Sequence, residues 1–108
     1  MTRPYNRRRN KVDEDHIREH AEKHGKATVA GDLKTAGSDL TPEAVDQAPE
    51  VMKAMPRELT GSEVTRVEKD GDAYVAIIEY SGDGAETKVA SKWEEREGRH
   101  RIVDLRVL

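Results

Sequence analysis

Three histidines recur at intervals of four residues near the start of the chain. His16, His20 and His24 lie between Asp13 and Ala30, a stretch whose composition predicts a helix. Residues four apart project from the same side of a helix, so consecutive pairs suit two-imidazole metal binding or proton transfer near pH ~6.5. His16 falls off the arc of His24, and no third ligand stands at a fixed spacing. We therefore predict no metal site, and neither a metal nor any other cofactor is required.

A proton-transfer site also needs a partner for the imidazole. Asp104 and Glu79 interrupt otherwise apolar strand segments, which is unusual for carboxylates without a role. If the first helix crosses a sheet, His20 or His24 can face Asp104 across the interior. We take His20, His24 and Asp104 as candidate catalytic residues, with a surface ion pair between Asp104 and an arginine as the alternative.

Aromatic residues supply the candidate ligand-binding positions. Tyr74, Tyr80 and Trp93 carry polar groups on large apolar bodies, and with Glu79 they could line a cavity for a small hydrophobic or carbonyl ligand. Packing in the core or at a dimer interface is the alternative role for the three aromatics.

Helix signals define the N-terminal half. Gly31 is expected to stop the first helix, Asp32 to cap a short turn, and residues 37–39 to break the chain. A further helix is expected to start at Thr41 as N-cap with Pro42 in its first turn and to end at Pro56.

That last helix carries its own pattern. Leu40 and Val45 are spaced as a hydrophobic staple, and Pro49 is expected to kink or divide the helix. Its apolar stripe continues through Ala48, Val51, Met52 and Met55.

Residues 63–108 read as four β-strands joined by short glycine-bearing turns at 70–71, 81–84 and 97–98. The strand from Ala73 to Tyr80 is apolar on both faces, so we expect helices to cover one face and a partner subunit the other. In the last strand, Val103, Leu105 and Val107 are expected to form the apolar face.

Composition limits the core. Of 108 residues, 34% are hydrophobic and 38% charged, with no Phe and no Cys. Such a thin core favours a homodimer through the sheet, and the absence of cysteine fits a reducing compartment. No apolar stretch reaches the ~20 residues of a membrane span, so we expect a cytoplasmic protein that does not contact a membrane.

Charge is uneven along the chain. Residues 1–11 hold five bases and no acid, whereas the rest holds 14 bases and 22 acids. We expect a flexible basic tail at 1–11 and a single domain at 12–108. Contact of the tail with nucleic acid is the less favoured reading.

The order of these elements carries a resemblance. The segments Ala30-Gly31-Asp32-Leu33, Leu40-Thr41-Pro42-Glu43-Ala44 and Trp93 to Asp104 make residues 13–108 similar to the nuclear transport factor 2-like superfamily. The resemblance implies an α+β fold in which N-terminal helices pack in the concave face of a curved four-stranded antiparallel sheet, the cystatin-like cone.

In many members the cone holds a small hydrophobic ligand. Some are isomerases, dehydratases or polyketide cyclases, and others are binding or dimerisation modules. No catalytic motif of those enzymes matches this chain residue by residue. We expect a ligand-binding or accessory dimerisation module, with a cofactor-independent enzyme as the first alternative and a dimeric scaffold with a nucleic-acid-touching tail as the second.

Overall fold

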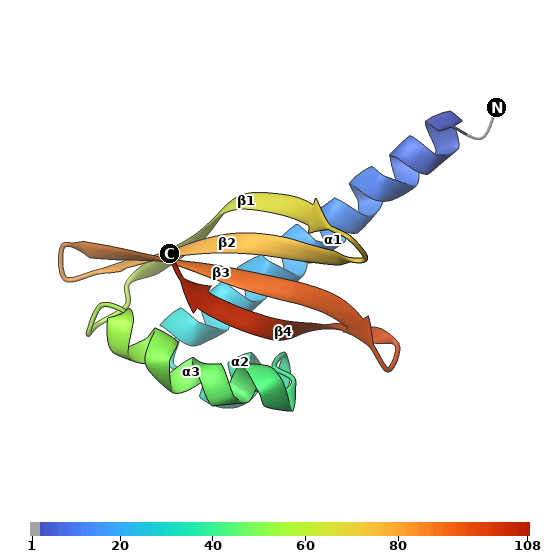
Figure 1. Ribbon diagram of the computed structural model, residues 1–108. Helices are drawn as coiled ribbons and strands as arrows, with labels where there is room; N and C mark the ends of the chain where they lie inside the picture. Colours follow the sequence, from blue (N-terminus) through green and yellow to red (C-terminus); the bar gives the residue numbers. More distant parts are fainter. Residues whose placement is uncertain (1–2) are drawn as a thin grey trace.

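The protein has an α+β fold in which three helices pack against a curved, open, antiparallel sheet (Figure 1). The computed structural model describes the backbone of residues 3–108 and the side chains of residues 13–108. The elements are α1 (Arg3–Val29), α2 (Leu33–Ser38), α3 (Pro42–Ala54), β1 (Gly61–Asp70), β2 (Ala73–Gly82), β3 (Ala85–Arg96) and β4 (Arg99–Val107).

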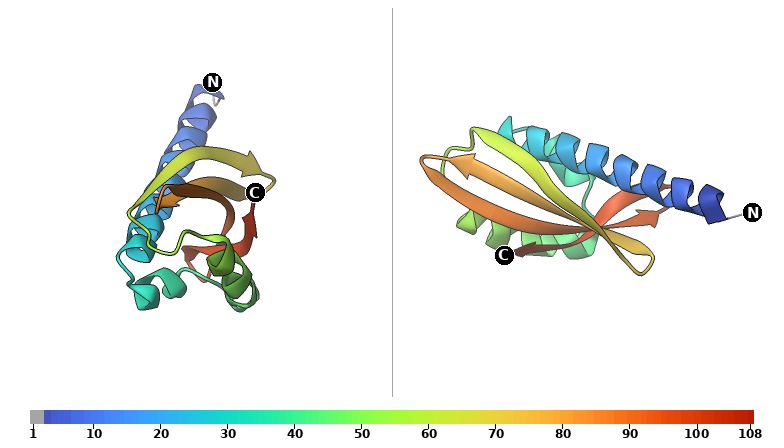
Figure 2. Two further views of the ribbon diagram at one scale, coloured as in Figure 1. Left: turned by 90° about the vertical axis from the view of Figure 1, so that its left-hand side faces the viewer. Right: turned by 90° about the horizontal axis from the view of Figure 1, so that it is seen from above.

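The strands follow one another in the order β1-β2-β3-β4, and the helices lie on what we call the inner face. Helix α1 crosses β1 and β2, α2 packs on α1, and α3 runs along β4 (Figure 2). None of the described helices combines the length and the apolar character that crossing a bilayer requires.

Helix α1 begins at Arg3, ten residues before the expected start at Asp13. Side chains before residue 13 lie outside the described part of the chain, so the flexible tail and its contact with nucleic acid stay predictions. The stop at Gly31 is confirmed. Gly31 has φ +77°, and hydrogen bonds from Gly31 N to Thr28 O and from Asp32 N to Ala27 O close the helix end.

The expected caps of α2 and α3 are present. The Asp32 carboxylate accepts a hydrogen bond from Thr35 N, and the Thr41 hydroxyl accepts from Ala44 N. Hydrogen bonding with the Thr35 side chain, and then with Thr35 N, lowers the pKa of Asp32. One expectation is wrong, because α2 continues through Gly37 to Ser38. Helix α3 is not divided at Pro49, so of the two expected effects the kink stays a prediction.

Tight turns join the strands. Gly71-Asp72, Asp83-Gly84 and Glu97-Gly98 are the two-residue loops, so the first turn lies one residue later than expected. Both residues of the second and third loops have positive φ, as type I′ turns require.

Bulges in β1 and β4 decide which side chains reach the core. The ladder shifts between Val64 and Arg66, which lets Val64 and Val67 both face inward although they are three residues apart. A second shift, at Val103, brings Ile102 and Leu105 to the inner face. Leu105 and Val107 of the expected apolar face do lie on the inner face, opposite Ser91 and Val89, but the expectation is wrong for Val103, because period-two alternation breaks at the bulge.

Strand β4 lies at one edge of the sheet, and the segment between α2 and α3 pairs with it. Thr41 N donates to Ile102 O, and Ile102 N donates to Asp39 O. Further along, the Gln47 amide oxygen accepts from Leu105 N at 2.8 Å while its nitrogen donates to Asp104 Oδ1 at 2.8 Å. The backbone of this edge is thus bonded by the helical segment.

Gly82 tests how closely the loop after α3 packs on β2. A Cβ there would lie 1.7 Å from Glu58 O, whereas a Cβ at Gly37 meets nothing within 4 Å. We expect Gly82→Ala to lower the free energy of unfolding by about 1–3 kcal/mol. Gly37→Ala, the matched control in α2, should raise it by up to about 1 kcal/mol. Urea unfolding measures both, and equal effects would contradict the close approach.

Candidate functional site

Asp39 joins three segments of the chain at the end of α2. Its Oδ2 lies 3.0 Å from His24 Nδ1 on α1, and its Oδ1 accepts from Arg99 Nη2 at 2.9 Å at the start of β4. The Asp39 side chain is 17% exposed and that of His24 8%. A histidine with a carboxylate partner is therefore present, but the carboxylate is Asp39.

The local sequence explains this placement. Gly31 reverses the chain, and Asp32 starts α2 at once, so α2 folds back against α1. The Asp39 amide donates to Ala36 O and ends α2, which leaves the Asp39 side chain facing His24.

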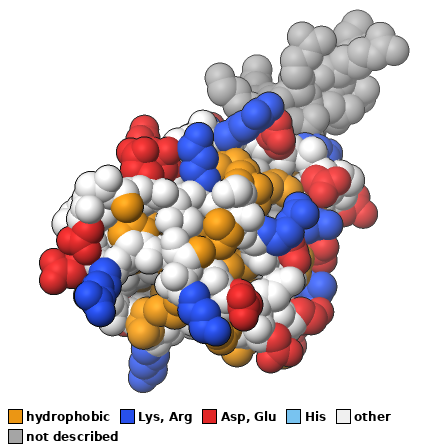
Figure 3. All heavy atoms as spheres, turned by 60° about the vertical axis from the view of Figure 1, so that its left-hand side comes forward, with side chains coloured by type: hydrophobic (Ala, Val, Ile, Leu, Met, Phe, Trp, Pro, Cys, Tyr) orange, Lys and Arg blue, Asp and Glu red, His pale blue; other side chains and the backbone are white. Residues whose placement is uncertain are grey.

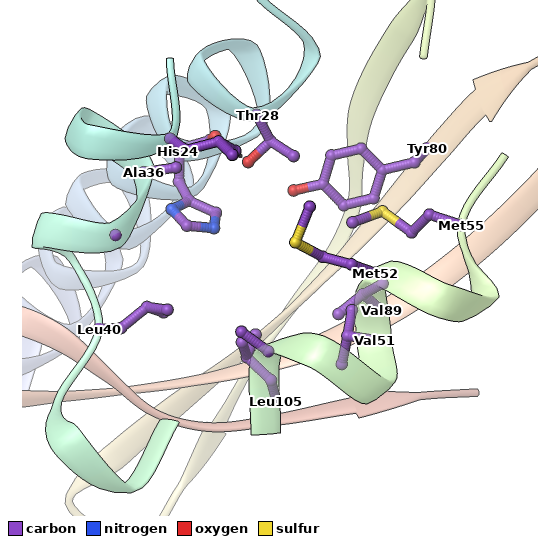
Figure 4. A pocket seen from close by; sticks show the side chains of 13 residues that line it. His24, Thr28, Ala36, Leu40, Val51, Met52, Met55, Tyr80, Val89 and Leu105 are labelled. Atoms are coloured by element: carbon purple, nitrogen blue, oxygen red, sulfur yellow. Dashed lines mark hydrogen bonds between the residues drawn. The ribbon is translucent and has the colours of Figure 1, made fainter. Parts of the chain in front are cut away.

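Beside His24 lies a cavity of about 150 Å³, bounded by all three helices and the inner face of the sheet (Figure 4). Its lining is His24, Thr28, Leu33, Ala36, Gly37, Leu40, Ala48, Val51, Met52, Met55, Tyr80, Val89 and Leu105. The four residues of the apolar stripe expected on α3 are all among them. Leu33 and Met52 are 55% and 50% exposed, which places them at its mouth.

Few polar groups reach this cavity. His24 Nδ1 is taken by Asp39, and no described residue hydrogen-bonds Nε2, the ring nitrogen that faces the cavity in Figure 4. Thr28 Oγ1 donates to His24 O at 2.9 Å. The Tyr80 hydroxyl points toward Thr28, and burial raises the pKa of Tyr80, an effect that the Thr28 hydroxyl partly offsets.

This arrangement has a definite chemical capacity. A carboxylate on Nδ1 fixes the orientation of the ring and favours the tautomer whose Nε2 lone pair is free. The site therefore offers one acceptor on His24 and one hydroxyl on Tyr80 within an apolar enclosure.

The other predicted aromatic residues pack in the core. Trp93 is 0% exposed, and its indole N–H donates to Ser91 Oγ, which donates in turn to Ala76 O. Tyr74 is buried opposite Trp93 on β2, where burial raises its pKa, and neither residue lines the cavity.

His20 lies next to Trp93 and outside the cavity. Its ring centroid is 6.0 Å from that of Trp93 and 5.6 Å from that of His100. No group of three metal-ligating side chains in residues 13–108 is arranged to hold an ion.

Both predicted carboxylates lie on the outer face of the sheet. Asp104 pairs across the ladder with Lys92 and bonds to Gln47 and Arg106, and Glu79 stands opposite Lys88. The structure thus does not bring Asp104 together with His20 or His24, because the β4 bulge turns Asp104 away from the helices. The ion pair with an arginine is the role that the structure gives it.

Asp39 and Arg99 were missed because their partner is distant in the sequence. Asp39 directly follows Gly37-Ser38, where the sequence predicts a break in the chain and no functional residue. Treating residues 13–38 as an αα-hairpin would have placed the end of its second helix beside the first, which is the one signal that pointed to Asp39.

Comparison of the chain with protein-family models, with curated proteins and with solved structures gives no match. The site is therefore interpreted from its own geometry.

The position of His20 predicts a pH dependence of stability. Burial lowers its pKa below the usual 6.5, helped by His100, Lys23 and His16 and opposed by Asp39. His20 therefore binds a proton more tightly in the unfolded chain than in the folded chain. The free energy of unfolding falls as the pH falls from 6.5 to the lower pKa of His20 in the folded chain.

We expect urea unfolding between about pH 8 and pH 5 to show a smaller pH dependence for His20→Gln than for the wild type. His16→Gln, which removes the smallest of these contributions to the pKa of His20, is the control and should keep most of the wild-type dependence. An unchanged dependence in His20→Gln would contradict the assignment.

Proposed function

We propose that this protein binds a small, mostly apolar molecule that carries one hydrogen-bonding group. The observation that supports this most directly is the buried His24, held by Asp39 through Nδ1 and presenting Nε2 to an apolar cavity. His24 Nε2 has no hydrogen-bond partner among the described residues, so a ligand donor there would add one hydrogen bond, worth about 0.5–1.5 kcal/mol net.

The size of the cavity limits the ligand. At about 150 Å³ it is below the ~300 Å³ at which pockets for drug-sized ligands begin. Apolar cavities near ~150 Å³ hold a molecule the size of benzene. Met52 and Met55 add flexible walls, since thioether side chains adapt to irregular shapes. The ligand class is thus a six-membered ring or short chain with one hydroxyl or carbonyl group.

Titration with phenol and benzene, followed by NMR, tests this binding. Phenol should bind about tenfold more tightly than benzene, because one net hydrogen bond is worth roughly 1–1.5 kcal/mol. In His24→Phe, which keeps a ring against Trp93, that preference should disappear while benzene still binds. Ala48→Leu, which fills the cavity without removing a polar group, should abolish binding of both. Equal affinities for the two probes in the wild type would refute the proposal.

Proton transfer is the second candidate, favoured by the Asp39–His24 pair itself. A small ketone whose oxygen accepts from the Tyr80 hydroxyl would present its α-carbon to His24. There Nε2 can remove the α-proton to give an enolate and an imidazolium. The imidazolium exchanges this proton with solvent and then donates a solvent-derived proton back to the α-carbon. This is the cofactor-independent isomerase, dehydratase or cyclase type of chemistry.

Deuterium uptake by cyclohexanone in D₂O measures that step. The protein should accelerate exchange at the α-carbon beyond an equal concentration of imidazole, and His24→Phe should remove the acceleration. Tyr80→Phe should reduce it about 100- to 1000-fold, the range for loss of one donor to a developing oxyanion. Exchange equal to free imidazole would leave binding as the only function of the site.

The cone of the nuclear transport factor 2-like superfamily, with a cytoplasmic location, fits this proposal. Three helices against a curved four-stranded sheet with a cavity between them support it. Membership of the superfamily itself stays a proposal.

A further inference from the structure

The outer face of the sheet is apolar at its centre although none of the described helices covers it. Val75 and Ile77 of β2 point outward and are half-buried, and Ala90 of β3 beside Ile77 is 5% exposed. In Figure 1 this face is turned toward the viewer, with α1 behind it. A hollow of about 460 Å³ leaves room on this face for side chains of a facing surface. Its lining combines Val75, Ala90 and Val103 with a larger number of charged residues, namely Glu43, Asp70, Lys92, Arg96, Asp104 and Arg106.

Charged side chains flank this centre in two rows. Residues directly opposite in an antiparallel ladder share a face. The first row runs across the sheet as Glu68, Val75, Lys92 and Asp104, and the second as Arg66, Ile77, Ala90 and Arg106. Figure 3 shows, obliquely, apolar patches among side chains of both signs.

The rows have opposite charge at the sheet edges. Both edge positions of the first row are acidic, Glu68 on β1 and Asp104 on β4. Both edge positions of the second row are basic, Arg66 and Arg106. Within each edge strand the two charges already pair, Arg66 with Glu68 at 2.6 Å and Arg106 with Asp104 at 3.6 Å.

We propose that the outer face binds the same face of a second copy of this chain, related by a two-fold axis that runs across the strands between the two rows. This rotation exchanges the rows. Glu68 then faces the partner's Arg66, and Asp104 faces the partner's Arg106. Val75 faces the partner's Ile77 at the centre, and Lys92 faces the partner's Ala90.

The alternative axis, along the strands, is disfavoured by charge. It would place Glu68 over the partner's Asp104 and Arg66 over the partner's Arg106, and juxtaposed like charges disfavour association. Either axis keeps the strand directions of the two sheets aligned, a common mode of sheet packing, so the charges decide between the two axes. Each edge then carries a four-charge network, which stabilises more than an isolated surface pair.

Two double variants test the proposal by sedimentation at defined concentrations. Arg66→Glu/Arg106→Glu makes both rows acidic at the edges, and Glu68→Arg/Asp104→Arg makes both basic. Each alone should dissociate at least about tenfold more readily than the wild type, which is about 1.4 kcal/mol. An equimolar mixture should form the heterodimer. Far-UV circular dichroism melts establish that each variant is folded.

A charge exchange on β1 is the matched control. Arg66→Glu/Glu68→Arg keeps the net charge and exchanges the rows at one edge only, where the introduced glutamate would meet the introduced arginine of the partner subunit. Its dimer affinity should equal that of the wild type. Tighter association would indicate the axis along the strands and overturn the proposed one. A wild-type chain that stays monomeric at all concentrations, or a dimer unaffected by either double variant, would also overturn the proposal.

Discussion

The hydrogen bonds of the Asp39 carboxylate hold the domain together at the point where its helical and strand halves meet. One carboxylate receives His24 of α1 and Arg99 of β4, and the Asp39 backbone oxygen accepts from Ile102 N at 2.7 Å. Because the side chain is only 17% exposed, it is screened less by water than a surface pair. Loss of this residue would leave a mostly buried imidazole without its partner and free the α2–α3 connection from the sheet edge.

The interior is packed more densely on one side of His24 than on the other. Trp93, fully buried and bonded through Ser91 to Ala76, fills the part of the inner face nearest His20. Beyond His24 the lining consists of aliphatic and methionine side chains, and the absence of Phe leaves space that is not filled. One histidine therefore packs against indole on one side and meets a cavity on the other.

Local features such as caps and turns can be predicted from the sequence, whereas the face of the sheet on which a strand residue lies is predicted poorly. The caps at Asp32 and Thr41, the stop at Gly31 and the glycine turns follow from backbone chemistry within a few residues, and the structure has all of them. The stripe on α3 was found because helical periodicity is regular. The face of Asp104 was not found, because a single extra residue at Val103 inverts the alternation of β4 and leaves no compositional mark. The partner of His24 is not predicted for another reason: fifteen residues and the reversal of the chain at Gly31 separate His24 from Asp39.

The Gln47 side chain has a consequence for solubility. By bonding to Leu105 N it occupies a group that an incoming strand would need, and the Leu40–Ile102 bridge blocks the same edge further along. The opposite edge, β1, is interrupted by its bulge and bears charged residues at Glu63, Arg66, Glu68 and Lys69. Both edge strands thus disfavour pairing with a strand of another molecule. This protects a chain with few large apolar residues from forming fibrils through its sheet edges.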